Sequence, residues 1–287
     1  MNARTDPSIF ASPELYFATL SSGIRVPYVA SGSGEPLFFV HGSLCDFRYW
    51  DSQIGVLAKD FYCVSMSLGH YWPGGDGRAL GEFSWKNHVS ELAEFIAAMD
   101  VGPVHLVGHS RGGCVAFQLA RAYPHLVKSL TLADPGGPLQ IDGTAQASLP
   151  AATEALRAQV AELIENREIE SGIELFVDSV SMPGIWRKSP ISFRTMALDN
   201  ASTLPKQFRD PLPAYTREAA AEVKCPTLLI AGQKSPRMYH DNVEKLAEWI
   251  GSTETQVVAG ASHGMNVTHA AAFNRLLGAF VRSATSR

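Results

Sequence analysis

The most constraining feature of this chain is a short apolar run that ends in a serine between two glycines. The sequence VHLV at residues 104–107 leads directly into GHSRG at residues 108–112. This pattern predicts a strand, a sharp turn and a helix, with glycines where a side chain would strike the neighbouring backbone. Such a turn lifts the serine hydroxyl above the end of the strand, beside the amide groups that open the helix. The pattern therefore indicates a nucleophilic serine, Ser110.

Composition narrows the function classes. The 287 residues are 46% hydrophobic, which is enough for one large domain or for a domain with an insertion. The net charge of −4 leaves no basic surplus, so we expect neither nucleic acid nor a membrane as a partner. The four cysteines are widely spaced and fit buried thiols better than disulfides or a metal site. Because no signal peptide or long apolar run is recognisable, we expect a cytoplasmic protein.

Strand-like and helix-like segments alternate along most of the chain. This alternation predicts an α/β protein with a mostly parallel sheet that is covered on both faces by helices. Between about residues 138 and 215 the alternation gives way to a helical pattern with several aromatic residues and prolines. We therefore predict a core formed by residues 1–137 and 218–287, and an inserted helical cap formed by residues 138–217.

The order of these elements, together with three motifs, resembles the α/β-hydrolase fold. The motifs are the His41-Gly42 turn after an early strand, the serine turn at 108–112, and the late sequence GASHG at 260–264. The resemblance covers nearly the whole chain and implies serine-nucleophile chemistry. Because this fold hosts many reactions, the resemblance does not identify the substrate.

His263 is the candidate base. It lies in the expected loop between a strand that ends near Gly260 and the final helix, where the family places its catalytic histidine. The chain order, serine before histidine, also agrees with the family. We interpret His41 as part of the turn that carries the oxyanion loop, and His109 as a packing or hydrogen-bonding residue next to Ser110.

The acid departs from the usual family pattern. Family members commonly carry an aspartate three residues after the glycine that ends the strand at 227–232, but here that position is Ser235. A minority take the acid from the end of the strand before the cap, where this chain has Asp134. A carboxylate there would accept the Nδ1–H of His263 and fix its tautomer. We predict Asp134 as the acid; the alternatives are a simple turn at Asp134, Asp241 as the acid, and a Ser-His pair without one.

The resemblance also implies an oxyanion hole made of two backbone amides. These would be the N–H groups of Arg111 and Ser43, with Leu44 as a fallback for the second. We interpret the Arg111 side chain as structural. The candidate pocket residues are Leu44, His109, Tyr71, Trp72, Trp186 and Phe193. For Tyr71 and Trp72, packing of their own loop is an equal alternative.

Together these residues predict a cofactor-independent serine hydrolase that cleaves a carboxylic ester or lactone of a mainly apolar small molecule through an acyl-enzyme. Ser110 would attack the carbonyl, His263 would transfer the proton and Asp134 would orient His263. The same residues suit cleavage of a carbon–carbon bond. Two further classes stay open: a cofactor-free dioxygenase of this fold, and a ligand receptor that retains the triad. We expect no metal ion, and the sequence does not indicate an oligomeric state.

Overall fold

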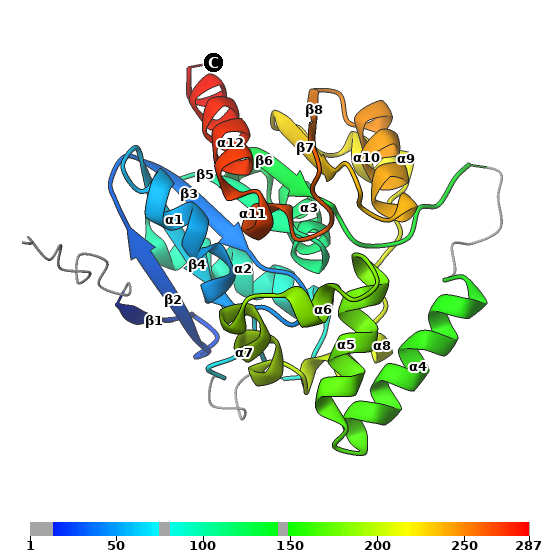
Figure 1. Ribbon diagram of the computed structural model, residues 1–287. Helices are drawn as coiled ribbons and strands as arrows, with labels where there is room; N and C mark the ends of the chain where they lie inside the picture. The colour runs from blue at the N-terminus through cyan, green and yellow to red at the C-terminus, as the bar shows by residue number, and fades with distance from the viewer. Residues whose placement is uncertain (1–13, 75–80, 143–148, 287) are drawn as a thin grey trace, which may run out of the picture.

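The computed structural model of the protein describes residues 14–74, 81–142 and 149–286. Within these residues the strands form one eight-stranded sheet (Figure 1). The strands are β1 (Leu15–Thr19), β2 (Arg25–Ser31), β3 (Glu35–Val40), β4 (Phe61–Met66), β5 (Val104–His109), β6 (Val127–Ala133), β7 (Thr227–Gly232) and β8 (Thr253–Val258). Their order is β1-β2-β4-β3-β5-β6-β7-β8. β2 pairs antiparallel with β1 and β4, and every other pair is parallel, so the predicted mostly parallel sheet is confirmed.

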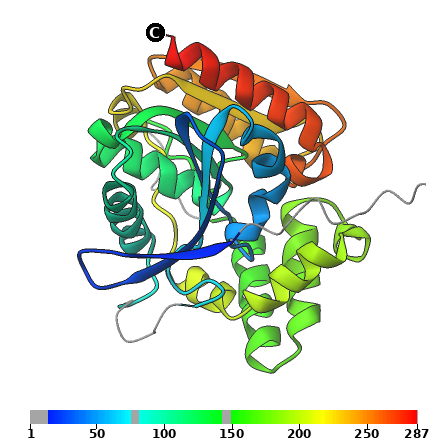
Figure 2. The same cartoon turned by 90° about the vertical axis from the view of Figure 1, so that its left-hand side faces the viewer.

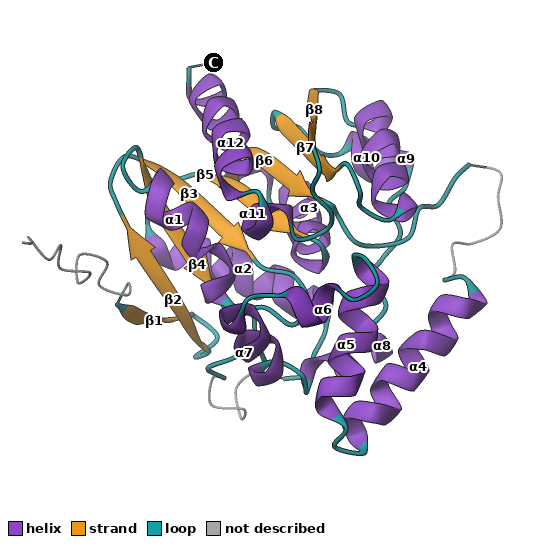
Figure 3. Ribbon diagram, viewed as in Figure 1, coloured by secondary structure: helices purple, strands orange, loops and turns teal. Residues whose placement is uncertain are grey.

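Helices cover both faces of this sheet (Figure 3). The longer helices of the core are α1 (Asp51–Leu57), α2 (Trp85–Met99), α3 (Arg111–Ala122), α10 (Arg237–Trp249) and α12 (Ala270–Thr285), and the shorter ones are η1 (Phe47–Trp50), η2 (Pro124–Leu126), α9 (Arg217–Ala221) and α11 (Met265–Thr268). Apolar side chains of α2, α3, α9 and α10 form one buried layer, and those of α1, α11 and α12 form the other. Along β3, Phe38 faces the first layer and Leu37 the second, as the two-residue period of a strand requires. No helix in the described ranges is long and apolar enough to span a membrane.

A separate group of helices connects β6 to β7. It consists of α4 (Ala151–Glu165), α5 (Ile169–Val180), α6 (Ile185–Lys188), α7 (Ile191–Asp199) and α8 (Thr203–Arg209). The group has its own buried cluster, which includes Val160, Ile173, Trp186 and Leu204. Figures 1 and 2 show that these helices lie together on one side of the sheet and its flanking helices. We refer to them below as the α4–α8 group.

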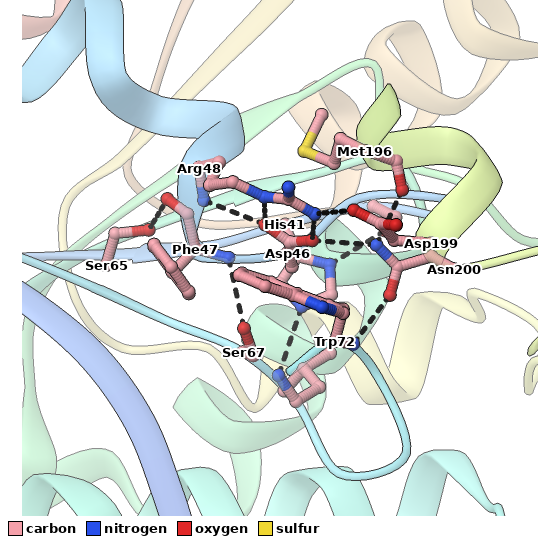
Figure 4. A network of polar contacts seen from close by, with 12 residues as sticks. His41, Asp46, Phe47, Arg48, Ser65, Ser67, Trp72, Met196, Asp199 and Asn200 are labelled. Carbon is pink, nitrogen blue, oxygen red and sulfur yellow. Dashed lines mark hydrogen bonds and ion pairs between the residues drawn. The ribbon is translucent and has the colours of Figure 1, made fainter. Parts of the chain in front are cut away.

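A buried carboxylate connects this group to the loop that follows β3. Asp46 is fully buried, and Figure 4 shows it between Arg48 and Asn200. The Arg48 guanidinium donates to both Asp46 oxygens at 2.8 and 2.6 Å, and Asn200 Nδ2 donates at 2.8 Å. The Oδ1 of Asn200 in turn accepts the N–H of Trp72 at 2.7 Å. Charge-assisted bonds of this kind are among the stronger ones in proteins, so they hold the loop before η1 in place.

Glu91 on α2 is a second buried carboxyl group and makes stability depend on pH. Its side chain is only 3% exposed and accepts the N–H of Gly69 at 3.0 Å. Burial, aided by the charge of Glu94 and opposed by the Gly69 N–H, raises the pKa of Glu91 to about 7 from its ordinary 4.5. The folded protein then holds this proton more tightly than the unfolded chain. The contribution to stability is therefore complete below pH 4.5 and is lost as the pH rises toward 7.

We expect Glu91→Gln to raise the free energy of unfolding at pH 8 by an amount on the order of 1–3 kcal/mol, because glutamine keeps the acceptor for Gly69 without the buried charge. The gain should shrink toward pH 5, where the native carboxyl group is already protonated. Urea unfolding of both proteins at pH 5 and pH 8 measures this. An equal gain at both pH values would show that the charge of Glu91 is not responsible.

Candidate active site

Ser110 stands at the turn between β5 and α3. Its backbone has φ 53° and ψ −122°, a left-handed conformation that is strained for a residue with a side chain. The turn is tight because other backbone lies against it: a Cβ at Gly112 would collide with the His41 carbonyl, and one at Gly108 would lie 2.5 Å from the Gly112 oxygen. These close backbone contacts explain why the turn requires glycine at both positions.

His263 and Asp134 are brought together from distant parts of the chain. Asp134 follows β6 and is fully buried, and His263 Nδ1–H donates to its Oδ2 at 3.1 Å. The same oxygen accepts the hydroxyl of Ser235 at 2.5 Å, and Oδ1 accepts the N–H of Gly232 at 3.3 Å. Asp241 instead forms an exposed ion pair with Arg237 on α10. The structure therefore gives Asp134, and not Asp241, the position of a partner for His263.

The imidazole of His263 lies between two other rings. Tyr239 stacks on it with ring centres 4.1 Å apart and an interplanar angle of 19°, and His109 lies at 4.5 Å. His109 Nε2–H donates to the backbone carbonyl of His263 at 2.8 Å, and burial lowers the pKa of His109 far below its ordinary value. His109 is thus a neutral supporting residue. Burial raises the pKa of the Tyr239 hydroxyl, and Tyr239 lines the same cavity as Ser110.

Backbone amide groups beside Ser110 are free to bind an oxyanion. Among the described residues, the N–H groups of Ser43, Leu44 and Arg111 form no hydrogen bond with protein. The N–H of Arg111 is the first of α3, where the helix dipole favours negative charge. The Arg111 side chain turns to Asp210, to which it donates at 2.7 Å, and its guanidinium lies 5.0 Å from the centre of Phe83. That contact agrees with a structural role for the side chain.

Two cavities among the described residues meet at Ser43 and Ser110. The smaller, of about 310 Å³, is lined by His263 and by three of the predicted pocket residues, Leu44, His109 and Phe193, together with apolar residues of α5 and α6. The larger, of about 620 Å³, is lined by Tyr239 and residues of α4 and α8. Both lie between the core and the α4–α8 group, so a molecule at Ser110 contacts both parts.

The other predicted pocket residues line neither cavity, which corrects that part of the prediction. Tyr71 is buried with its ring 4.7 Å from that of His41, so it packs its own loop. Trp72 lies under the Arg48 guanidinium at 4.0 Å. Trp186 is only 1% exposed and belongs to the buried cluster of the α4–α8 group. Aromatic rings have large apolar areas, and here packing within the protein satisfies them.

The sequence analysis did not predict the contacts that Ser235, Tyr239 and Asp210 make in this site, although it singled out the position of Ser235. Ser235 occupies the position where the family usually has its acid, and its hydroxyl donates to Asp134, the predicted acid. Tyr239 and Asp210 reach the site through stacking and an ion pair between segments far apart in sequence. No group of His, Cys, Asp and Glu within the described residues could hold a metal ion.

The comparisons with known proteins identify the family. The sequence model of the Alpha/beta hydrolase family matches residues 37–276, so the chain belongs to this family and is a hydrolase. It is 22% identical, over 92% of its length and 97% of the relative, to the (E)-2-((N-methylformamido)methylene)succinate hydrolase of Acinetobacter baylyi. It is 25% identical to a putative carbamate hydrolase, RutD, of Azorhizobium caulinodans, over 87% of its length and 92% of the relative.

Solved structures support the same fold. An esterase from Exiguobacterium antarcticum superimposes with a TM-score of 0.78 at 19% identity, covering 93% of this chain and 98% of that one. At this identity the likeness is one of fold. The α/β-hydrolase fold predicted from the sequence is therefore confirmed.

Phe193 and Trp186 provide a matched test of which aromatic residues determine selectivity. We expect Phe193→Ala to change KM and the preferred substrate size, because Phe193 lines the smaller cavity. Trp186→Ala should instead lower stability by about 3–5 kcal/mol, because it leaves a hole in a buried cluster. Kinetics with short and long aryl esters, together with thermal unfolding, separate the two effects. A size-selective change in the Trp186 variant at unaltered stability would contradict this assignment.

Proposed function

We propose that this hydrolase cleaves a carboxylic ester or lactone of a mainly apolar small molecule, with Ser110 as the nucleophile. The strongest support is the placement of Ser110 where two cavities meet, with His263 lining the smaller one and bonded to the buried Asp134. An acyl group on one side of the serine and a leaving group on the other require such a junction. Cavities of about 300–1,000 Å³ are typical of small-molecule sites.

The reaction follows from these positions. Ser110 attacks the ester carbonyl while His263 takes its proton through Nε2, and Asp134 holds the proton on Nδ1 and stabilises the imidazolium. The amides of Ser43 and Arg111 stabilise the negative oxygen of the tetrahedral intermediate. His263 then gives its proton to the departing alcohol, and the acyl group stays bound to Ser110. A water molecule, deprotonated by His263, releases the acid and restores the serine.

The α4–α8 group acts as the cap in this proposal, within the insertion at residues 138–217. Apolar side chains of α5 and α6, among them Val177, Val180 and Ile185, line the smaller cavity with Phe176. They would exclude bulk water from the bond that is cleaved, which strengthens the hydrogen bonds to the oxyanion.

A carbamate is the second candidate substrate class. One relative of similar length is named a putative carbamate hydrolase, and a carbamate carbonyl is attacked by the same serine and stabilised by the same amides. The two classes differ in the group left on Ser110, which is an acyl group from an ester and a carbamoyl group from a carbamate. Parallel assays with an ester and a carbamate of the same alcohol decide between them.

Ser110→Ala tests the nucleophile directly. We expect a fall in kcat of about 10⁴-fold or more on aryl esters, with an unchanged thermal unfolding curve, because only one hydroxyl is lost. A fluorophosphonate reagent should label the wild type and not the variant, as read by intact mass. A variant that retains a tenth of the wild-type rate would exclude an acyl-enzyme at this serine, and oxygen consumption would then test the dioxygenase alternative.

Asp134→Asn tests the acid. An asparagine keeps the shape but can present an N–H to His263 Nδ1 and so favour the wrong tautomer, for which we expect a loss of up to about 10⁴-fold in kcat. Asp241→Asn is the matched control, since Asp241 forms an exposed ion pair with Arg237 on the surface, and its kcat should stay close to the wild-type value. Equal losses in both variants, or none in Asp134→Asn, would refute the assignment.

A further inference from the structure

The larger cavity contains a cation that the protein does not neutralise. Arg157 on α4 lines this cavity together with Ser110 and Tyr239. Within the described ranges it forms no hydrogen bond and no ion pair; its one specific contact is with the Phe208 ring, whose centre lies 5.4 Å from the guanidinium carbon. Arg111 lines the same cavity but is paired with Asp210 at 2.7 Å. The two arginines therefore differ in whether a carboxylate of the protein already binds them.

Arg157 is half-buried, and even partial burial without a carboxylate partner is unfavourable for its guanidinium. Burial lowers the pKa of Arg157, and the positive charge of Arg111 acts in the same direction. Tyr239 and Glu154 oppose the shift, but Glu154 forms no ion pair with Arg157 although it lines the same cavity. A guanidinium keeps its proton at neutral pH in any case. The cavity thus holds a charged fork of N–H donors that lacks a carboxylate acceptor.

The position of Arg157 relates it to the reaction. Arg157, Tyr239 and Ser110 all line this one cavity. A group bound by Arg157 therefore belongs to a molecule that also reaches Ser110. The rest of the wall is mostly apolar, with Leu156, Phe208, Leu212 and Met238 among its residues. An apolar chain that ends in an anion complements such a surface.

We propose that Arg157 binds a carboxylate of the substrate, which is then an ester with a free carboxylate several atoms away from the bond that is cleaved. Hemiesters of dicarboxylic acids belong to this class. One unpaired guanidinium with Glu154 on the same wall suits a singly charged carboxylate better than a doubly charged phosphate. This substrate class rests on the proposed hydrolysis at Ser110, and Arg157 is a specificity-determining residue within it.

The kinetic test compares an aryl hemiester of adipic acid with a neutral aryl ester of the same chain length. We expect the wild type to favour the hemiester in kcat/KM by about 10–100-fold, the range given by one charge-assisted interaction. Arg157→Gln should remove most of this preference, mainly through KM, and Arg157→Lys should keep part of it. Arg209→Gln is the matched control, because Arg209 is exposed and paired with Glu165; its preference should equal that of the wild type.

A binding measurement keeps this inference separate from the proposed hydrolysis. By calorimetry, 6-oxoheptanoate should bind the wild type at least tenfold more tightly than heptan-2-one, and Arg157→Gln should lose the difference even if no ester is cleaved. Equal losses for both esters or both ketones would mean that Arg157 only packs the cavity, and would overturn the proposal. Stronger competition by inorganic phosphate than by acetate would overturn the carboxylate class. If the fluorophosphonate fails to label Ser110, the proposed nucleophile is wrong, but the calorimetric test of Arg157 is unaffected.

Discussion

The buried carboxylate of Asp134 is the interaction on which this site depends. A carboxylate without solvent is costly unless donors surround it, and here the donors come from His263, Ser235 and Gly232. Gly232 ends β7, and Ser235 and His263 lie in the loops that follow β7 and β8, so the hydrogen bonds to this one carboxylate fix the relative positions of two loops and the ends of two strands. His263 cannot turn away without leaving Asp134 short of a donor. Orientation of the imidazole is thus a consequence of the stability of the fold.

A second buried carboxylate, Asp46, fixes the loop that follows β3 in the same way. Asp46, also fully buried, accepts from Arg48 and Asn200, and Asn200 belongs to the α4–α8 group at the end of α7. The loop that carries Ser43 is therefore connected to that group through a buried charge, and separating the two would leave this charge without its donors, which is unfavourable. In the proposed mechanism, movement of these helices would shift the loop whose Ser43 amide binds the oxyanion.

The sequence predicted the parts of the site that depend on local patterns. The turn at Ser110 needs only a strand, two glycines and a helix. The place of Asp134 came from the resemblance to those hydrolases that carry the acid at the end of the strand before the cap. Tyr239, Asp210 and Asn200 escaped prediction because their contacts join segments far apart in the chain and depend on how helices pack. Tyr71, Trp72 and Trp186 were proposed for the pocket because large rings are common there, yet a ring equally satisfies a loop or a helix cluster. Periodicity cannot separate these cases.

Selectivity in this protein then follows from the difference between its two cavities. The smaller one is lined mostly by apolar residues, among them Val177 and Phe193, with Lys188 also in its wall. Its apolar contacts discriminate by size, and a methylene group is worth only about 1–3 kcal/mol in such a pocket. The larger one contains Arg157, and a guanidinium that loses solvent to a bound molecule discriminates against any substrate without an acceptor for it. A neutral ester in this cavity would leave that cation without a carboxylate partner. Charge in one cavity therefore selects the class of substrate, and shape in the other selects among its members.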